Sequence, residues 1–176
     1  MFDELKRKIA HYIIRHKFLK KSKEQIHFSK VISNSKTVFI ILPADQKDLY
    51  YSLNIVDYLV MKDKQITFFV LFENRNAITK YDNATILTYN STSITKIFLP
   101  NKTLIQKLNS MEFDLVIDLE RNENTFMSAV ANIVKSKVRI GFKKNRSENY
   151  YNLLIQNSDQ NIESNYMNLL TSIKML

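Results

Sequence analysis

One stretch near the start of the chain, Lys36 to Leu59, constrains the fold more than any other. It opens with a continuous apolar run, Val38 to Leu42, which is short and β-rich, as a strand buried on both faces would be. Pro43 and a polar crossing follow, and apolar residues then return at helical spacing, at positions 49, 53, 56 and 59. A strand, a loop and a helix in this order form the unit of an open α/β sheet, in which ligands bind beside the carboxyl ends of the strands.

The rest of the chain repeats this alternation. Further strands are expected at residues 66–72, 84–89, 114–118, 138–142 and 151–155. Helices are expected at residues 2–21, 49–60, 73–81, 100–108, 122–134 and 161–176. Strands that alternate with helices predict a single Rossmann-like α/β domain over residues 36–176, with a mostly parallel sheet flanked by helices. A basic amphipathic helix and a connecting segment, residues 1–35, precede that domain.

The composition excludes several classes of function. The 176 residues contain one glycine, Gly141, so neither a Walker loop nor a glycine-rich dinucleotide fingerprint can be present. There is no cysteine, which excludes a disulfide framework and thiolate chemistry. The three histidines have no metal-ligand spacing with other ligand-type residues, so we expect no metal site. No apolar run approaches the length of about 18 residues that spans a membrane, and the N-terminus lacks the form of a secretory signal.

Positive charge is concentrated at the N-terminus. Residues 1–30 hold nine Lys and Arg residues against three acidic ones, which is +6 of the net charge of +9. The helix expected at residues 2–21 carries an apolar stripe, from Phe2 to His16, opposite a basic face. The residues that we expect to contact an anionic membrane surface are Lys6, Arg7, Lys8, Arg15, Lys17, Lys20 and Lys21.

Two other interpretations of this helix stay open. The apolar stripe could pack on the domain and leave the charges in solvent. The charge could instead contact nucleic acid, although no base-stacking motif accompanies it. In the membrane interpretation the protein is cytoplasmic and peripheral on the inner membrane.

Several motifs resemble the N-terminal half of glycosyltransferase family nine, the ADP-heptose:lipopolysaccharide heptosyltransferases and their relatives. The segment VFIILPADQKDLYYSLNIVDYL is similar to the first strand, loop and helix of that family. It aligns Asp48 with the aspartate of the family's Ser-Leu-Gly-Asp loop. Later motifs of the family are similar to FDLVIDLE (113–120), Ser128-Ala129, VRIGF (138–142) and the closing Asn165-Tyr166 with Leu169-Leu170. The resemblance runs over residues 36–176.

The resemblance implies a metal-independent, inverting transfer from a nucleotide-sugar donor such as ADP-heptose. Asp48 would be the general base that takes the proton of an acceptor hydroxyl. Residues 36–176 would correspond to the acceptor-binding half of a two-domain enzyme whose donor-binding domain the chain lacks. We therefore expect an acceptor-binding domain for lipopolysaccharide or other surface-glycan assembly, split or degenerate, that holds no cofactor and is not active alone. A separately made donor-binding domain is then an expected partner.

The chain departs from the family near Asp48. Lys47 replaces the glycine before the aspartate and could pair with it, and Arg121 replaces a glycine after the fourth strand. Asp45 and Asp48 could also be structural carboxylates at the start of a helix. The basic residues expected to bind an anionic glycan or glycolipid acceptor are Lys47, Lys143, Lys144 and Arg146.

A second hypothesis comes from a different class of protein. In it the chain is a non-enzymatic module that docks on an anionic membrane surface or a protein partner through residues 1–30. Asp118 and Glu120 end a strand at the same edge as Asp48, and they are given no catalytic role in either hypothesis.

Overall fold

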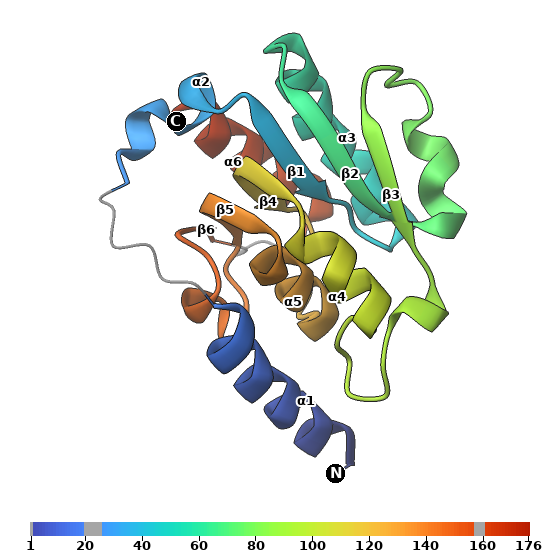
Figure 1. Cartoon of the computed structure of the whole chain (residues 1–176). Helices are drawn as coiled ribbons and strands as arrows, with labels where there is room; N and C mark the ends of the chain where they lie inside the picture. The colour runs from blue at the N-terminus through green and yellow to red at the C-terminus, as the bar shows by residue number, and fades with distance from the viewer. Residues whose placement is uncertain (1, 20–25, 157–160) are drawn as a thin grey trace.

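Six parallel strands form one sheet in the order β3-β2-β1-β4-β5-β6 (Figure 1). The computed structural model describes residues 2–19, 26–156 and 161–176. The strands are β1 (Thr37–Ile41), β2 (Gln65–Leu71), β3 (Thr85–Tyr89), β4 (Glu112–Asp118), β5 (Lys135–Phe142) and β6 (Leu153–Ile155). This order, which reverses between β1 and β4, is that of a doubly wound Rossmann-like sheet, and it confirms the predicted fold class.

Helices cover both faces of the sheet (Figure 1). The helices of one face are α3 (Gln46–Met61) and α6 (Ile162–Lys174), and those of the other are α4 (Lys102–Asn109) and α5 (Thr125–Ile133). Beside α5 lies α1 (Phe2–Ile13), which continues as a π-helical turn, η1 (Ile14–Phe18). The short elements are η2 (Phe28–Lys30), α2 (Val31–Asn34), η3 (Phe72–Ile78), η4 (Ser91–Ser93) and η5 (Ser147–Asn149).

Strand β1 explains why its sequence is apolar without alternation. Val38 and Ile40 point into the core beneath α3 and α6, whereas Phe39 and Ile41 point into the core beneath α4 and α5. All four side chains are fully buried. A strand covered on both faces needs apolar residues at every position, and this is the pattern that the sequence predicted.

The two halves of the sheet meet at β1. It pairs with β2 on one side and with β4 on the other, so that Ile41 lies opposite both Phe69 and Asp118. At its start, the Asp114 carboxylate of β4 accepts hydrogen bonds from the Lys36 and Thr37 backbone N–H groups, at 2.8 and 2.9 Å. Segments almost eighty residues apart in sequence are thus joined at both ends of this strand pair.

The predicted elements have counterparts in the structure, with differences in type and at their ends. The helix predicted at residues 73–81 is the 3₁₀-helix η3. The predicted N-terminal helix extends to Phe18, and its last two predicted residues lie outside the described part of the chain. Strand β5 begins at Lys135, before the predicted Val138, because its first residues are polar and carry no apolar signal.

Candidate functional site

The carboxyl ends of β1 and β4 meet where the order of the sheet reverses, the position at which sheets of this kind bind ligands. The chain leaves β1 toward α3 on one face and leaves β4 toward α5 on the other. Asn74, in η3, holds the first of these loops, because its side-chain amide donates to the Ala44 carbonyl at 2.7 Å. Polar side chains from several elements converge at this edge of the sheet.

Asp45 begins α3 as its N-cap residue. Its carboxylate accepts hydrogen bonds from the backbone N–H groups of Lys47 and Asp48, at 2.9 and 3.0 Å. Asp45 is therefore a structural carboxylate. Asp48 lies in the first turn of the helix, turns its side chain inward and is only 2% exposed.

A guanidinium from the loop between β4 and α5 covers the Asp48 carboxylate. Arg121 Nε donates to Asp48 Oδ1 at 3.0 Å, and a terminal nitrogen of Arg121 lies 3.5 Å from Oδ2. The hydrogen bond and the negative charge of Asp48 raise the pKa of Arg121. Lys47, the partner considered from the sequence, is exposed instead, because adjacent residues of a helix project in different directions. Arg121, in the place of an expected glycine, is the counter-ion of Asp48.

Tyr166 of α6 forms the wall of the site behind this pair. Its hydroxyl donates to the Leu119 carbonyl at 2.8 Å, and the side chain is 1% exposed. Burial raises the pKa of Tyr166, and the nearby carboxylates of Asp48 and Glu120 raise it further. The phenol is therefore a neutral hydrogen-bond donor that ties α6 to the end of β4.

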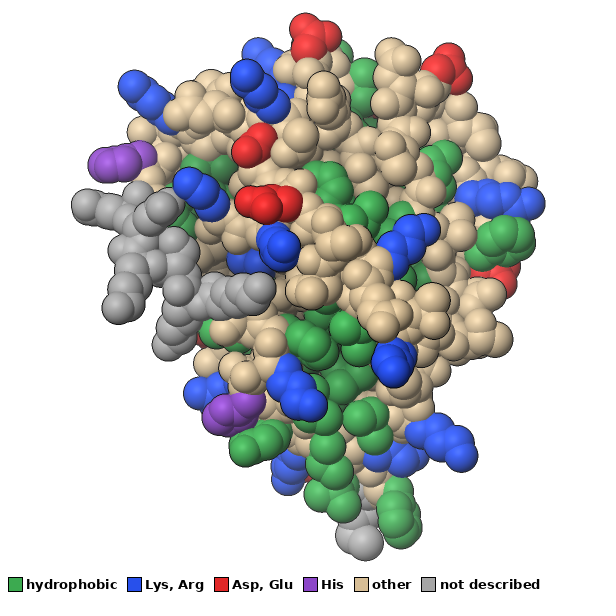
Figure 2. Space-filling model, viewed as in Figure 1, with side chains coloured by type: hydrophobic (Ala, Val, Ile, Leu, Met, Phe, Trp, Pro, Cys, Tyr) green, Lys and Arg blue, Asp and Glu red, His purple; other side chains and the backbone are tan. Residues whose placement is uncertain are grey.

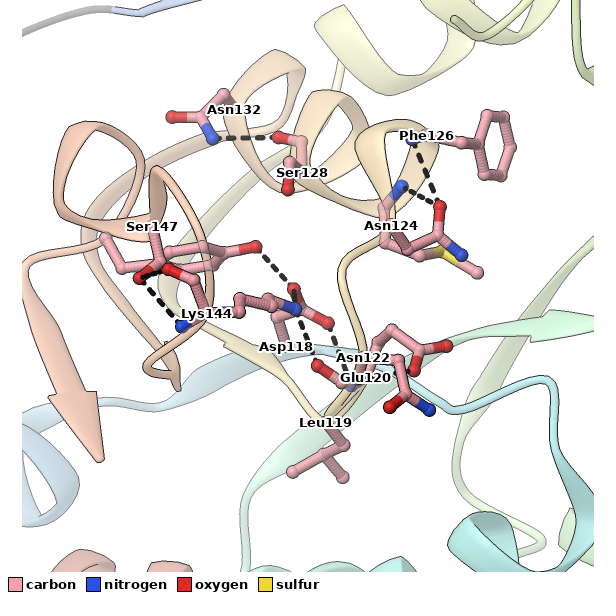
Figure 3. Close-up of polar contacts among 12 residues, drawn as sticks. Asp118, Leu119, Glu120, Asn122, Asn124, Phe126, Ser128, Asn132, Lys144 and Ser147 are labelled. Carbon is pink, nitrogen blue, oxygen red and sulfur yellow. Dashed lines mark hydrogen bonds and ion pairs between the residues drawn. The ribbon is translucent and has the colours of Figure 1, made fainter. Parts of the chain in front are cut away.

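Asp118, the last residue of β4, is fully buried and fully engaged (Figure 3). The Lys144 ammonium lies 2.9 Å from its Oδ2 and also donates to the Glu120 carbonyl at 2.5 Å. The Tyr151 hydroxyl donates to the same carboxylate oxygen, and the Glu120 backbone N–H donates to Oδ1 at 3.0 Å. Burial and the charge of Asp118 raise the pKa of Tyr151, which keeps its proton.

Glu120 is the third carboxylate of the site. Unlike those of Asp48 and Asp118, its carboxylate forms no salt bridge with Lys or Arg among the described residues. Glu120 is 6% exposed and accepts a hydrogen bond from the Asn122 backbone N–H at 3.0 Å. Burial raises the pKa of Glu120, and the neighbouring Asp118 and Asp48 charges act in the same direction. Three carboxylates and the two cations Arg121 and Lys144 therefore form a nearly balanced, largely buried charge cluster.

The basic residues predicted to bind an acceptor do not share one position. Lys144 points inward to Asp118, and its side chain is 6% exposed. Arg146 faces α1 and lines a cavity with residues of that helix. Lys47 and Lys143 are exposed to solvent. Acceptor binding by these four residues stays a prediction, as does the role of Asp48 as a general base.

Sequence reasoning did not assign a site role to Arg121, Tyr151 or Tyr166. The replacement of an expected glycine by Arg121 was a signal, because a long cation at such a position needs a partner. The sequence pattern places Tyr151 at the start of a predicted strand and Tyr166 on the apolar stripe of a predicted helix. Hydrophobic periodicity does not indicate which group a tyrosine hydroxyl will bind, so the contacts of these two residues were not predictable from the sequence.

The outer face of α1 contradicts the interpretation in which its apolar stripe packs on the domain. The inward residues are Ala10, His11 and Ile14, which lie against the core beside α5. Four stripe residues instead face solvent, with exposed fractions of 78% for Phe2, 57% for Leu5, 43% for Ile9 and 65% for Tyr12. Ile13, which was predicted on the same stripe, packs partly against the core. The helix therefore contacts the domain through the face that carries fully buried Ala10, and its larger apolar residues lie on the outer face.

The surface around this stripe is basic. Figure 2 shows hydrophobic side chains gathered over the lower part of the molecule, where α1 lies in Figure 1, with Lys and Arg side chains around them. Lys8, Arg15 and Lys17 are exposed, whereas Lys6 and Arg7 are half-buried. The Arg7 guanidinium stacks 5.0 Å from the centre of the Phe98 ring.

Two predicted basic residues, Lys20 and Lys21, lie outside the described residues. Within the part of the chain that the structure describes, no helix combines the length and the apolar character needed to cross a membrane.

Two solved structures resemble this fold. A glycosyl transferase of family 9 from Veillonella parvula DSM 2008 is 15% identical, with a TM-score of 0.58, and the match covers 80% of this chain and 42% of that chain. E. coli heptosyltransferase WaaC, solved with ADP-2-deoxy-2-fluoro heptose, is 13% identical, with a TM-score of 0.55, over 77% of this chain and 47% of that chain. The chain thus spans less than half the length of either protein. For the fold, these similarities confirm the predicted resemblance to glycosyltransferase family nine.

A match to a family profile over most of the chain shows which sequence family the chain belongs to. No curated protein matches the chain. The profile of DUF6913, described as a family of unknown function, matches residues 6–176, which include most of α1 and the whole sheet. The chain belongs to the DUF6913 family, whose fold in this member is that of one half of a family 9 glycosyltransferase.

Proposed function

We propose that this protein is a degenerate glycosyltransferase-like domain, which binds an anionic glycan or glycolipid acceptor and does not transfer sugar by itself. The observation that carries the proposal is the Arg121–Asp48 pair, in which Nε and Oδ1 are 3.0 Å apart. The fold likeness to a family 9 enzyme and to a heptosyltransferase supports the choice of an acceptor that belongs to lipopolysaccharide or other surface-glycan assembly.

A general base must present a free lone pair to the acceptor hydroxyl. The guanidinium of Arg121 donates to both oxygens of Asp48, and the carboxylate is 2% exposed. Breaking such a pair to admit a sugar hydroxyl would leave a buried carboxylate without its counter-ion, which is unfavourable. We therefore expect Asp48 to support the structure of the site rather than to accept a proton.

The donor is the second part of the proposal. In a two-domain transferase the donor and the acceptor are held together by both halves, and that positioning supplies much of the rate enhancement. The chain covers 42% of one similar structure and 47% of the other. In our proposal a nucleotide sugar such as ADP-heptose would be held by a donor-binding domain outside residues 1–176, and the protein would work in the cytoplasm at the inner membrane.

The experiment combines binding and turnover. The purified chain is titrated with a lipid A-core acceptor, and transfer from ADP-heptose is measured for the wild type and for Asp48→Asn. Asp82→Asn, a change at an exposed carboxylate, is the matched control. We expect saturable acceptor binding by the wild type and no turnover. Turnover by the chain alone, lost only in Asp48→Asn, would show an active transferase, and a folded wild type without saturable binding would exclude the acceptor role.

The exposed apolar face of α1 favours a second candidate function, docking on an anionic membrane. An amphipathic helix with exposed Phe2, Leu5 and Tyr12 beside exposed Lys and Arg can insert its apolar face at the headgroup level. Each basic residue near an anionic surface contributes about 1 kcal/mol. Charge complementarity therefore points to anionic lipid as the partner of this face.

Vesicle co-sedimentation tests this candidate. We expect binding to vesicles that contain phosphatidylglycerol but not to pure phosphatidylcholine vesicles, with loss of binding in Leu5→Ser/Tyr12→Ser. The control is Tyr50→Ser/Met61→Ser, which removes comparable exposed apolar side chains from α3. Equal loss in both double variants would show that general surface hydrophobicity, rather than α1, controls the association.

A further inference from the structure

A cavity of ≈ 390 Å³ lies between the N-terminal helix and the turn that follows β5. Lys8, Arg15 and His16 line it from α1 and η1, and Arg146 and Asn149 line it from the turn. The cavity is separate from the sheet edge around Asp48, and it shares only Tyr12 and His16 with the apolar stripe of the helix. It joins two segments that are at least 130 residues apart in sequence.

The charge of the cavity has one sign. Its described lining includes Lys8, Arg15 and Arg146, which are cationic at neutral pH, and contains no acidic side chain. Outside the lining, Glu4 pairs with the Lys8 ammonium at 3.2 Å, and Glu123 lies 4.0 Å from His11 Nε2. Cations gathered around one hollow repel one another, and a bound anion would relieve that repulsion.

The turn that carries Arg146 is held in a fixed shape. Arg146 has a φ of 62°, in the left-handed region that non-glycine residues seldom adopt. The next residue, Ser147, is 1% exposed, and its hydroxyl donates to the Lys144 carbonyl at 2.6 Å and accepts from the Lys144 N–H at 3.0 Å. The strained residue is thus fixed by its surroundings, as strained residues at binding sites commonly are.

The wall of the cavity is also rigid. His11 and Tyr150 line it, and their rings stack at 5.7 Å with an angle of 10° between their planes. His11 Nδ1 lies 2.6 Å from the Tyr150 hydroxyl, whereas His11 Nε2 is buried and has no hydrogen-bond partner among the described residues. A rigid wall lowers the entropic cost of binding a small ligand.

We propose that this cavity is a binding site for a terminal phosphate group, one that carries a single substituent, as in a phosphate monoester or in pyrophosphate. Guanidinium groups bind phosphate through paired N–H donors, and the cavity is lined by two of them, Arg15 from η1 and Arg146 from the turn after β5. Lys8 adds a point charge, and the Asn149 side chain adds a neutral donor. Arg146 is also one of the residues predicted to bind an acceptor, but the site requires neither sugar transfer nor membrane docking, so it goes beyond both functions proposed above. The phosphate belongs either to a soluble compound or to a lipid headgroup.

The direct test is a titration of the full chain with pyrophosphate, in which calorimetry measures the affinity and ¹⁵N NMR locates the residues that respond. We expect saturable binding with shifts confined to α1, η1 and residues 146–150. Arg15→Gln and Arg146→Asn should each weaken binding about tenfold, since each removes a charge-assisted contact. Asn tolerates the left-handed conformation, so the turn is preserved. Lys107→Gln, on exposed α4, is the matched control and should leave the affinity unchanged.

Vesicles distinguish the two sources of phosphate. Binding to phosphatidic acid in preference to phosphatidylglycerol at equal charge, with competition by pyrophosphate, identifies a lipid monoester. Pyrophosphate binding without that preference identifies a soluble phosphorylated compound. Both outcomes support the site. The proposal is overturned if pyrophosphate does not bind, or if binding persists unchanged in the Arg15→Gln/Arg146→Asn double variant. Transfer and phosphatidylglycerol docking are measured separately, so their failure does not affect this result.

Discussion

The Lys144 ammonium reaches 2.9 Å from the Asp118 carboxylate, and both side chains are buried, although Asp118 ends β4 and Lys144 follows β5. A basic residue in a loop after a strand suggests an exposed ligand contact, and here it is an internal counter-ion. The pair fixes the segment after β5 to the end of β4. Lys144 and Asp118 therefore stabilise the structure at this edge of the sheet.

Loss of one partner of this pair should be costly. Lys144→Met leaves the Asp118 charge buried with only hydrogen bonds to offset it, and we expect the free energy of unfolding to fall by about 3–5 kcal/mol. Urea denaturation followed by circular dichroism measures the change. The double variant Asp118→Asn/Lys144→Met should recover part of the loss, because neither charge remains. A loss below about 1 kcal/mol in the single variant would show that the pair is hydrated in solution.

Arg139 should be as important for stability as an apolar core residue. Its buried guanidinium donates to three backbone carbonyls, those of Ala131, Val134 and Ser136, at 2.7, 2.8 and 2.9 Å. Burial lowers the pKa of Arg139, and the carbonyl groups at the end of α5 compensate its charge. Arg139→Lys replaces the planar guanidinium group by a single ammonium, which cannot reach all three carbonyl groups. The substitution should lower the free energy of unfolding by about 2–3 kcal/mol. The exposed change Arg75→Lys is the control for urea denaturation.

Stability should fall in mild acid, partly because of His11. Burial lowers the pKa of His11, the positive charges of Arg146 and Arg7 lower it further, and Glu123 opposes them. The unfolded histidine, with a pKa of about 6.5, then binds protons that the folded one does not. The contribution of His11 is present above pH about 6.5 and is lost as the pH falls toward its lowered pKa. Urea denaturation between pH 5 and 7.5 should show a shallower dependence in His11→Gln; an unchanged slope would contradict this assignment.

The single glycine of the chain supports the packing of Tyr151. A methyl group at Gly141 would lie 3.1 Å from two carbon atoms of the Tyr151 ring, which the hydrogen bond to Asp118 holds in place. Gly141→Ala should therefore lower the free energy of unfolding by about 1–3 kcal/mol. In a Tyr151→Phe background the ring can shift, and the cost of the same substitution should shrink. Thermal denaturation of the four proteins gives the coupling, and additive effects would argue against this contact.

The sequence predicted the fold well because each element carries a local signal. The apolar run of β1 and the helical spacing of α3 follow from a few adjacent residues, and motif order then predicted the parallel sheet. The pairing of Asp48 was not predictable in this way, because its partner Arg121 is 73 residues away. The outward position of Phe2 on α1 depends on which face of that helix packs on α5, which no periodicity reveals.

The position of β1 between β2 and β4 has a consequence for synthesis on the ribosome. Its second edge is filled only by β4, which ends at Asp118, so the earlier strands emerge while that edge still has unpaired N–H and C=O groups. An apolar strand with an open edge is a site for association between nascent chains. We therefore expect nascent chains arrested before β4 has emerged to associate more readily than chains in which β4 has paired with β1 and the Asp114 carboxylate has bound the start of that strand.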